Sequence, residues 1–233
     1  MRKESFFVIL FAFVAVGCSS RTMATIKEFP LLKGTRWVYS YRAYQPSISN
    51  PRQIARATYQ LTDTVTDTEF VSPYFIAHVQ SVWKLVQSDS GWMEDFISNQ
   101  PNETWYVVNG QQVFGSKQAI DIKNINTDDL LLDYDFPLVV NKNWCPMKVD
   151  FKDPTHKIAN CQSAGKREIT NQSTLETPAG KFDNCYDMVD YFNDGNFYQK
   201  FCNGVGIVSL QFDHAGTPFG FEQTLTHFSA GAQ

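Results

Sequence analysis

The chain has 233 residues, of which 43% are hydrophobic and 19% are charged. This composition is sufficient to bury a core and excludes an intrinsically disordered chain. The formal net charge is −4, and a mildly acidic surface gives no electrostatic reason to expect nucleic acid as a partner.

The first residues have the pattern of an export signal. A basic pair, Arg2-Lys3, precedes an apolar run over 6–16, and a small residue then precedes Cys18. The run is too short to cross a hydrocarbon core of about 30 Å as a helix, but it has the size of the apolar region of a signal peptide. We therefore predict that residues 1–17 are a signal peptide.

This segment resembles the signal of bacterial lipoproteins, in which the cysteine becomes the lipidated first residue of the mature chain. The resemblance implies lipidation of Cys18 by acyl chains such as palmitate, and a lipidated tether over 18–27. Ser19 follows, rather than the aspartate that often signals inner-membrane retention, which implies an anchor in the outer membrane facing the periplasm. The alternative is an ordinary cleaved signal with an incidental cysteine.

Period-two alternation dominates the rest of the chain and predicts strands with one dry face and one wet face. In 55–66 the dry face carries Ala55, Ala57, Tyr59, Leu61, Asp63 and Val65. Further strands are predicted at 37–44, 74–86, 92–98 (weakly), 104–115, 143–151, 157–163, 166–176, 182–192, 197–202, 205–213 and 219–228. A short helix is expected only within 117–134, around 127–132.

Turn signals recur about every ten residues, as in antiparallel sheets that curl or close. The predicted fold is mainly β: an antiparallel meander of roughly a dozen strands forming a curved sheet or open barrel, with little helix after the signal peptide. No linker rich in Pro, Gly or Ser divides the chain, so we predict a single β domain over 28–228. One hairpin contains Asn109-Gly110, whose type I′ turn would place Trp105 opposite Phe114.

The cysteines beyond Cys18 are even in number, which in an exported chain suggests two disulfides. We predict Cys145–Cys161, which flank a hairpin turning at 152–156, and Cys185–Cys202, which flank another. A two-residue Asp-Gly turn in the second hairpin would leave its cysteines one pair out of alignment, so a shift of the turn is needed to join them. The alternative is four free, buried thiols.

The chain contains an internal echo. The run Phe29-Pro30-Leu31, Gly34 and Trp37 reappears with the same spacing as Phe136-Pro137-Leu138, Asn141 and Trp144. Gly and Asn both accept left-handed backbone geometry. Two explanations stay open: an old duplication of half a sheet, or two strand entries that use the same turn chemistry.

These two motifs, together with Thr177–Phe182 and Gly204–Val208, resemble a group of uncharacterised bacterial secreted proteins and lipoproteins. Such families are similar to lipoprotein carriers of the LolA/LolB kind, whose fold is an unclosed barrel. The resemblance implies a concave apolar face that holds a lipid or an acyl chain. This chain lacks the clear lid helices of those carriers.

No catalytic or metal-binding motif is present: the sequence has no GxSxG, HExxH, phosphate-binding loop, calcium loop or zinc spacing. We therefore predict no enzyme, no cofactor and no metal site. The acidic cluster Asp128, Asp129, Asp133 and Asp135 is interpreted as a solvated loop or the first turn of a short helix. Aromatic stripes in the strands are more often core than ligand platform.

Three functions remain. The first is a lipid-anchored envelope protein that binds an apolar ligand or lipid in a concave sheet. The second is a structural or protein-interaction lipoprotein with a solid core, and the third and weakest is a hydrolase with a dispersed site. An apolar cavity of a few hundred Å³ within the sheet would favour the first.

Overall fold

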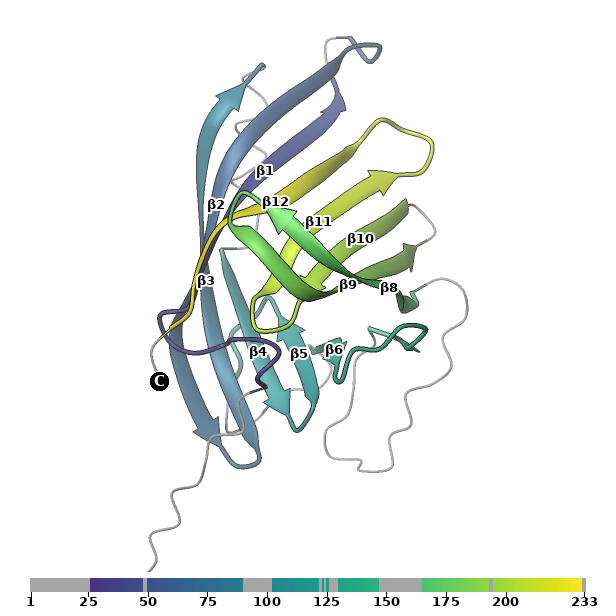
Figure 1. The fold of residues 1–233 in the computed structure, drawn as a ribbon. Coiled ribbons are helices and arrows are strands. Elements are labelled where there is room, and N and C mark those ends of the chain that lie inside the picture. The colour runs from purple at the N-terminus through teal and green to yellow at the C-terminus, as the bar shows by residue number, and fades with distance from the viewer. Residues whose placement is uncertain are drawn as a thin grey trace, which may run out of the picture.

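The computed structural model describes residues 26–47, 50–89, 102–121, 123, 125, 130–146, 165–192 and 195–231. These residues form one 12-stranded antiparallel sheet that rolls into a nearly closed barrel (Figure 1). No helix occurs in this described part of the chain. The predicted fold class is therefore confirmed.

Each strand pairs with its neighbours in the chain except that β6 does not pair with β7, and the first strand also pairs with the last. The order across the sheet is β6-β5-β4-β3-β2-β1-β12-β11-β10-β9-β8-β7. The strands are Arg36–Pro46 (β1), Ile54–Val71 (β2), Tyr74–Ser88 (β3), Glu103–Asn109 (β4), Gln112–Ser116 (β5), Leu131–Asp135 (β6), Asn143–Trp144 (β7), Arg167–Thr177 (β8), Gly180–Phe192 (β9), Gly195–Cys202 (β10), Gly206–His214 (β11) and Gly220–Ser229 (β12).

The echoed motifs occupy equivalent places in the two halves of the sheet, β1 to β6 and β7 to β12. Gly34 and Asn141 both have left-handed backbones, with φ of 86° and 71°. The N–H of Gly34 donates to the carbonyl of Val65 at 2.8 Å, and that of Asn141 donates to the carbonyl of Ile169 at 2.8 Å. Each motif thus anchors the first strand of its half to the second, an arrangement that both explanations predict.

The strands β6 and β7 are the two edges of the described sheet, and side chains close the seam between them. The indole Nε1 of Trp144 donates to the carbonyl of Leu132 at 3.2 Å. The guanidinium of Arg167 donates to the carbonyl of Asp133 and forms two hydrogen bonds of 2.5 Å with the carboxylate of Asp190. The barrel is therefore continuous in space, although its backbone ladder is not.

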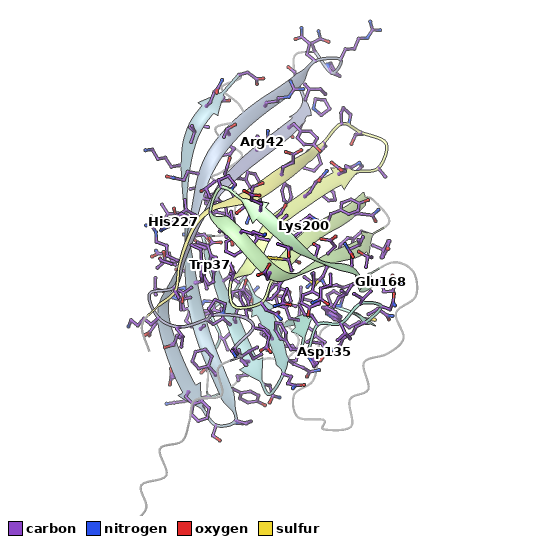
Figure 2. All side chains as sticks on the ribbon, in the orientation of Figure 1. Trp37, Arg42, Asp135, Glu168, Lys200 and His227 are labelled. Atoms are coloured by element: carbon purple, nitrogen blue, oxygen red, sulfur yellow. A yellow bond between two sulfur atoms is a disulfide. The ribbon has the colours of Figure 1, made fainter. Side chains whose placement is uncertain are left out.

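The main core is built around Phe29, which lies before β1. Its ring contacts those of Trp37, Tyr106, Tyr134 and Phe201, with centroids 5.3–6.2 Å apart. These rings come from four different strands, so Phe29 fills the barrel interior at the level of Trp37, which is labelled in Figure 2. A second, smaller cluster lies farther along β1 and β2: Tyr41, Ala43, Ala55, Ala57 and Tyr59.

The β4–β5 hairpin differs from the predicted register. Asn109 pairs with Gln112, so that Gly110 takes the first central position of the turn, and Trp105 lies opposite Ser116 rather than Phe114. Gly110 has φ of 59°, as the first central residue of a type II′ turn requires. Asn-Gly suits two turn types, and the sequence motif alone did not distinguish them.

The short helix expected around 127–132 is wrong over its described part. Leu131 begins strand β6, which pairs with β5, and residues 126–129 lie outside the described ranges. Leu132 and Tyr134 are both buried and alternate with more exposed neighbours. The edge of β5 provides backbone hydrogen-bond partners for residues 131–135, and this pairing outweighs a weak helical preference.

Cys185 and Cys202 form a disulfide, the pair predicted from the sequence, with their Cα atoms 4.0 Å apart. They lie directly opposite each other because Phe192 pairs with Gly195, which is the shift of the turn that their alignment needed. Cys145 is buried and disulfide-bonded. Its predicted partner, Cys161, lies outside the described residues, as do the predicted strands at 92–98 and 157–163.

Candidate functional site

A continuous band of aromatic rings crosses the inner face of the barrel. Each of the neighbouring strands β3, β2, β1, β12, β11, β10 and β9 contributes one ring, and every ring contacts the next with centroids 4.5–6.3 Å apart. We call this the aromatic band, and its members in that order are Trp83, Tyr59, Tyr41, Phe221, Phe212, Phe197 and Phe192.

The rings of the aromatic band differ in exposure. Tyr59 and Tyr41 are buried, Trp83, Phe221, Phe212 and Phe197 are half-buried, and Phe192 at the end of the band is 46% exposed. A purely structural core would bury its rings throughout, because exposed apolar surface is left in water. The far end of the aromatic band therefore remains available for contact.

An interior cavity of about 240 Å³ lies beside the aromatic band. Tyr41, Trp83 and Phe221 of the aromatic band form one part of its wall, whereas Leu61 and Val79 belong to the main core. The cavity thus separates the two apolar clusters of the barrel. Its size agrees with the expectation from a binding protein, but its wall is not purely apolar.

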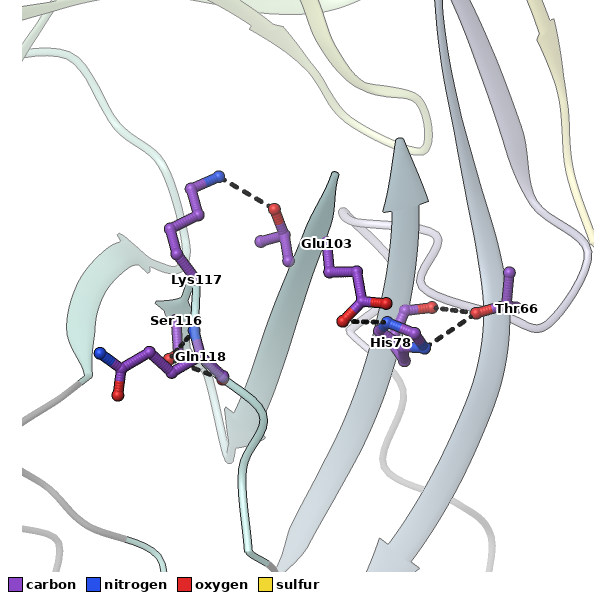
Figure 3. Close-up of polar contacts among 7 residues, drawn as sticks. Thr66, His78, Glu103, Ser116, Lys117 and Gln118 are labelled. Carbon is purple, nitrogen blue, oxygen red and sulfur yellow. Dashed lines mark hydrogen bonds and ion pairs between the residues drawn. The ribbon is translucent and has the colours of Figure 1, made fainter. Parts of the chain in front are cut away.

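Two hydrogen-bonded pairs contribute polar groups to this wall, which Gln223 also lines. The carboxylate of Asp63 accepts the hydroxyl of Ser81 at 2.6 Å. The ammonium of Lys117 donates to the hydroxyl of Thr104 at 2.9 Å (Figure 3). Burial raises the pKa of Asp63 from 3.8 to about 6, although the Ser81 hydrogen bond and the charge of Lys117 act in the opposite direction. The surroundings of Asp63 therefore disfavour the ionised form of its carboxyl group.

A second cavity of about 290 Å³ adjoins the first, since Thr104 and Lys117 line both. Asp133 also lines it, and its carboxylate lies against Gly115. Burial raises the pKa of Asp133, while Arg167 and Lys117 lower it. Asp133 is thus an interior residue, and its interpretation as a solvated loop or helix residue is wrong; Asp128 and Asp129 lie outside the described residues.

The sequence held one signal for this site that motif searching missed. Asp63 stands on the apolar face of the alternating run 55–66, where a carboxylate is out of pattern. The other polar residues come from β3, from β4 and from the residue after β5. Only the strand order brings Ser81, Thr104 and Lys117 toward Asp63, so no local spacing could have grouped them.

A different cluster on β2, β3 and β4 has the groups of a hydrolytic triad. The hydroxyl of Thr66 lies 3.0 Å from Nδ1 of His78, and Nε2 of His78 lies 3.7 Å from Glu103 (Figure 3). The Thr66 hydroxyl also lies 3.3 Å from the carbonyl of His78, a second acceptor within its reach. The imidazole stacks on Trp105, with centroids 4.3 Å apart. Glu103 lies beyond hydrogen-bond distance of Nε2, so the cluster lacks the hydrogen bond by which an acid orients the base of a triad.

The remaining predicted site residues are divided between the described and undescribed parts of the chain. Cys18 lies outside the described residues, and the disulfide Cys185–Cys202 lies in the β9–β10 hairpin, away from the cavity walls. Within the described ranges, no group of three or more His, Cys, Asp or Glu residues is arranged to hold a metal ion. No helix there has the length and apolarity to span a bilayer.

Comparison with known proteins finds similarity in shape only. No protein-family model and no curated protein matches the chain. A solved structure from Bacteroides fragilis, assigned as an exported protein with a YmcC-like fold, has 13% identity and a TM-score of 0.47, covering 88% of this chain and 100% of that one. A second, from Parabacteroides distasonis and assigned as a lipoprotein, has 12% identity and a TM-score of 0.46, covering 88% and 99%.

Proposed function

We propose that this protein is a lipid-anchored protein of the bacterial envelope that holds an apolar ligand against the aromatic band. The observation that carries the proposal is a continuous run of ring contacts beside an interior cavity. Aromatic side chains give a large contact area at a small entropic cost, because they have few rotatable bonds. A hydrocarbon chain is the simplest ligand for such a surface, in keeping with the resemblance to lipoprotein carriers.

The anchor rests on the sequence around Cys18. Acylation would hold the barrel at a bilayer, because each buried CH₂ contributes about 0.8 kcal/mol and two or more chains give stable attachment. Mass spectrometry of the mature N-terminus tests this part. The expected result is a chain that begins at Cys18 and carries acyl groups; an unmodified start, or cleavage elsewhere, contradicts the anchor.

Ligand binding is tested by native mass spectrometry and lipid extraction of the mature protein purified from its own envelope. The expected result is a bound apolar molecule that is reduced in Phe197→Ala. Tyr198→Ala is the matched control, because Tyr198 follows on the same strand, points to the opposite face and is 43% exposed. If the wild-type protein carries nothing, or if both variants lose the molecule equally, the proposal fails.

A further inference from the structure

The polar wall of the 240 Å³ cavity presents an acid and a base that do not pair with each other. Asp63 is hydrogen-bonded to Ser81, and Lys117 is hydrogen-bonded to Thr104. Among the described residues, no ion pair joins the carboxylate of Asp63 to the ammonium of Lys117 within 4.0 Å. The cavity therefore displays a negative and a positive group at separate points of its wall.

At the equivalent position in the other half of the barrel, the charged residue has an ion-pair partner. Asp63 pairs with Trp37 in the sheet, and Arg167 pairs with the equivalent Trp144. Arg167 forms its two hydrogen bonds with Asp190 of the next strand, whereas the next strand beside Asp63 supplies only Ser81. The second half contains its own counter-ion, and the first half has a carboxylate facing a cavity instead.

The cavity is small relative to a whole amphiphile. Pockets for drug-sized ligands occupy roughly 300–1,000 Å³. A volume of about 240 Å³ suits a polar head group, and the attached chain then has to lie outside it. The aromatic band begins at Trp83 and Tyr41 on the cavity wall and leads toward Phe192, so it provides that path.

We propose that the cavity binds the head group of an amphiphile that carries both a protonated amine and an acidic oxygen. The amine would donate to Asp63, and the acidic oxygen would accept from Lys117. The hydrocarbon chain would follow the aromatic band toward Phe192. This inference rests on the proposed function and adds the chemical class of the ligand.

The test uses the full mature chain kept in solution by an amphipol and saturated with the uncharged dye 1-N-phenylnaphthylamine. Three competitors share a dodecyl chain: dodecylphosphoethanolamine, dodecyl phosphate and dodecylamine. Dodecylphosphoethanolamine is expected to displace the dye at a concentration at least about tenfold lower than either of the others, since charge-assisted hydrogen bonds contribute to binding at both ends of its head group.

Variants assign the two ends of the head group. Asp63→Asn is expected to weaken the amine-bearing competitors by about tenfold and to leave dodecyl phosphate unchanged. Lys117→Gln removes the ammonium and is expected to weaken only the phosphate-bearing competitors. The matched control is Asp67→Asn, which removes an exposed carboxylate of the same strand and should alter none of them.

The outcomes separate this inference from the proposed function. If the dye binds and Phe197→Ala weakens it, but the three competitors are equivalent or Asp63→Asn has no effect, the head-group assignment is wrong and the apolar site stands. If the dye does not bind, or binds independently of Phe197, both proposals fail. Retention of the far-ultraviolet circular dichroism spectrum establishes that each variant is folded, and the head-group variants should also retain dye binding.

Discussion

Replacing Asp63 with an asparagine should make the protein more stable at neutral pH. Burial raises the pKa of Asp63 from 3.8 to about 6, so the folded state holds a proton more tightly than the unfolded state does. The folded state then binds more protons between about pH 4 and pH 6, and the wild-type free energy of unfolding falls as the pH rises through this window. An upward shift of about two pKa units corresponds to at most about 3 kcal/mol at neutral pH.

The side-chain amide that this substitution introduces does not titrate, and its carbonyl oxygen can still accept the hydroxyl of Ser81. For a chain of this size, at most about 3 kcal/mol corresponds to a rise in Tm of up to about 10 °C. Thermal unfolding followed by circular dichroism at about pH 8 and about pH 4 measures the difference between variant and wild type. The difference should be large at the higher pH and close to zero at the lower one.

The control for this experiment is Asp67→Asn. Asp67 is exposed, and its hydrogen bond with Lys33 lowers its pKa, so this substitution should slightly reduce stability at neutral pH. The reasoning is refuted if Asp63→Asn is no more stable than the wild type at about pH 8, or if its advantage persists at about pH 4. A stabilising effect would mean that the native carboxylate is retained against stability, as residues in binding sites often are.

Three further experiments test the fold. Arg167→Met leaves a buried carboxylate without its cation and should lower the free energy of unfolding by about 3 kcal/mol or more in urea titrations; an unchanged midpoint would contradict the role of this residue in the seam. Gly206→Ala should lower the free energy of unfolding by about 3 kcal/mol, because φ is 98° and the new Cβ would lie 2.8 Å from a phenylalanine ring. Gly110→Ala, where φ is 59° and the space is open, should lower it by only about 1 kcal/mol. Replacing both Cys185 and Cys202 with alanine removes a disulfide that joins residues 17 apart in the sequence. The free energy of unfolding should fall by about 3 kcal/mol in the same titration without reductant. Equal stability would argue against the disulfide as a source of stability.

The sequence predicted most of the strands because alternation is a local property. Residues 55–66 repeat every two positions, and β2 covers them. The turns were less predictable, because Asn109-Gly110 fits two turn types that differ by one position in the register. Strand β6 was missed because three consecutive leucines, 130–132, carry no period of their own, and only the neighbouring strand determines their conformation.

The candidate site was less accessible to sequence reasoning. Asp63 stood out in the sequence as a carboxylate on the apolar face of an alternating strand, but a single such residue does not identify a ligand. The aromatic band depends on the pairing of β1 with β12, which joins residues near opposite ends of the described chain. No local spacing encodes that closure, so the rings looked like separate core stripes until the strand order was known.

The seam between β6 and β7 makes the wall of the barrel unequal around its circumference. Separating any other two neighbouring strands would break a row of backbone hydrogen bonds. Separating β6 from β7 would instead break side-chain contacts, among them those of Trp144 and Arg167 and the ion pair between Lys142 and Asp135. The barrel wall is therefore weakest along the β6–β7 seam, which lies next to the cavity that Asp133 lines. A ligand too large for the barrel interior could be accommodated if the barrel opened along this seam, because the hydrogen bonds between the other strands would remain intact.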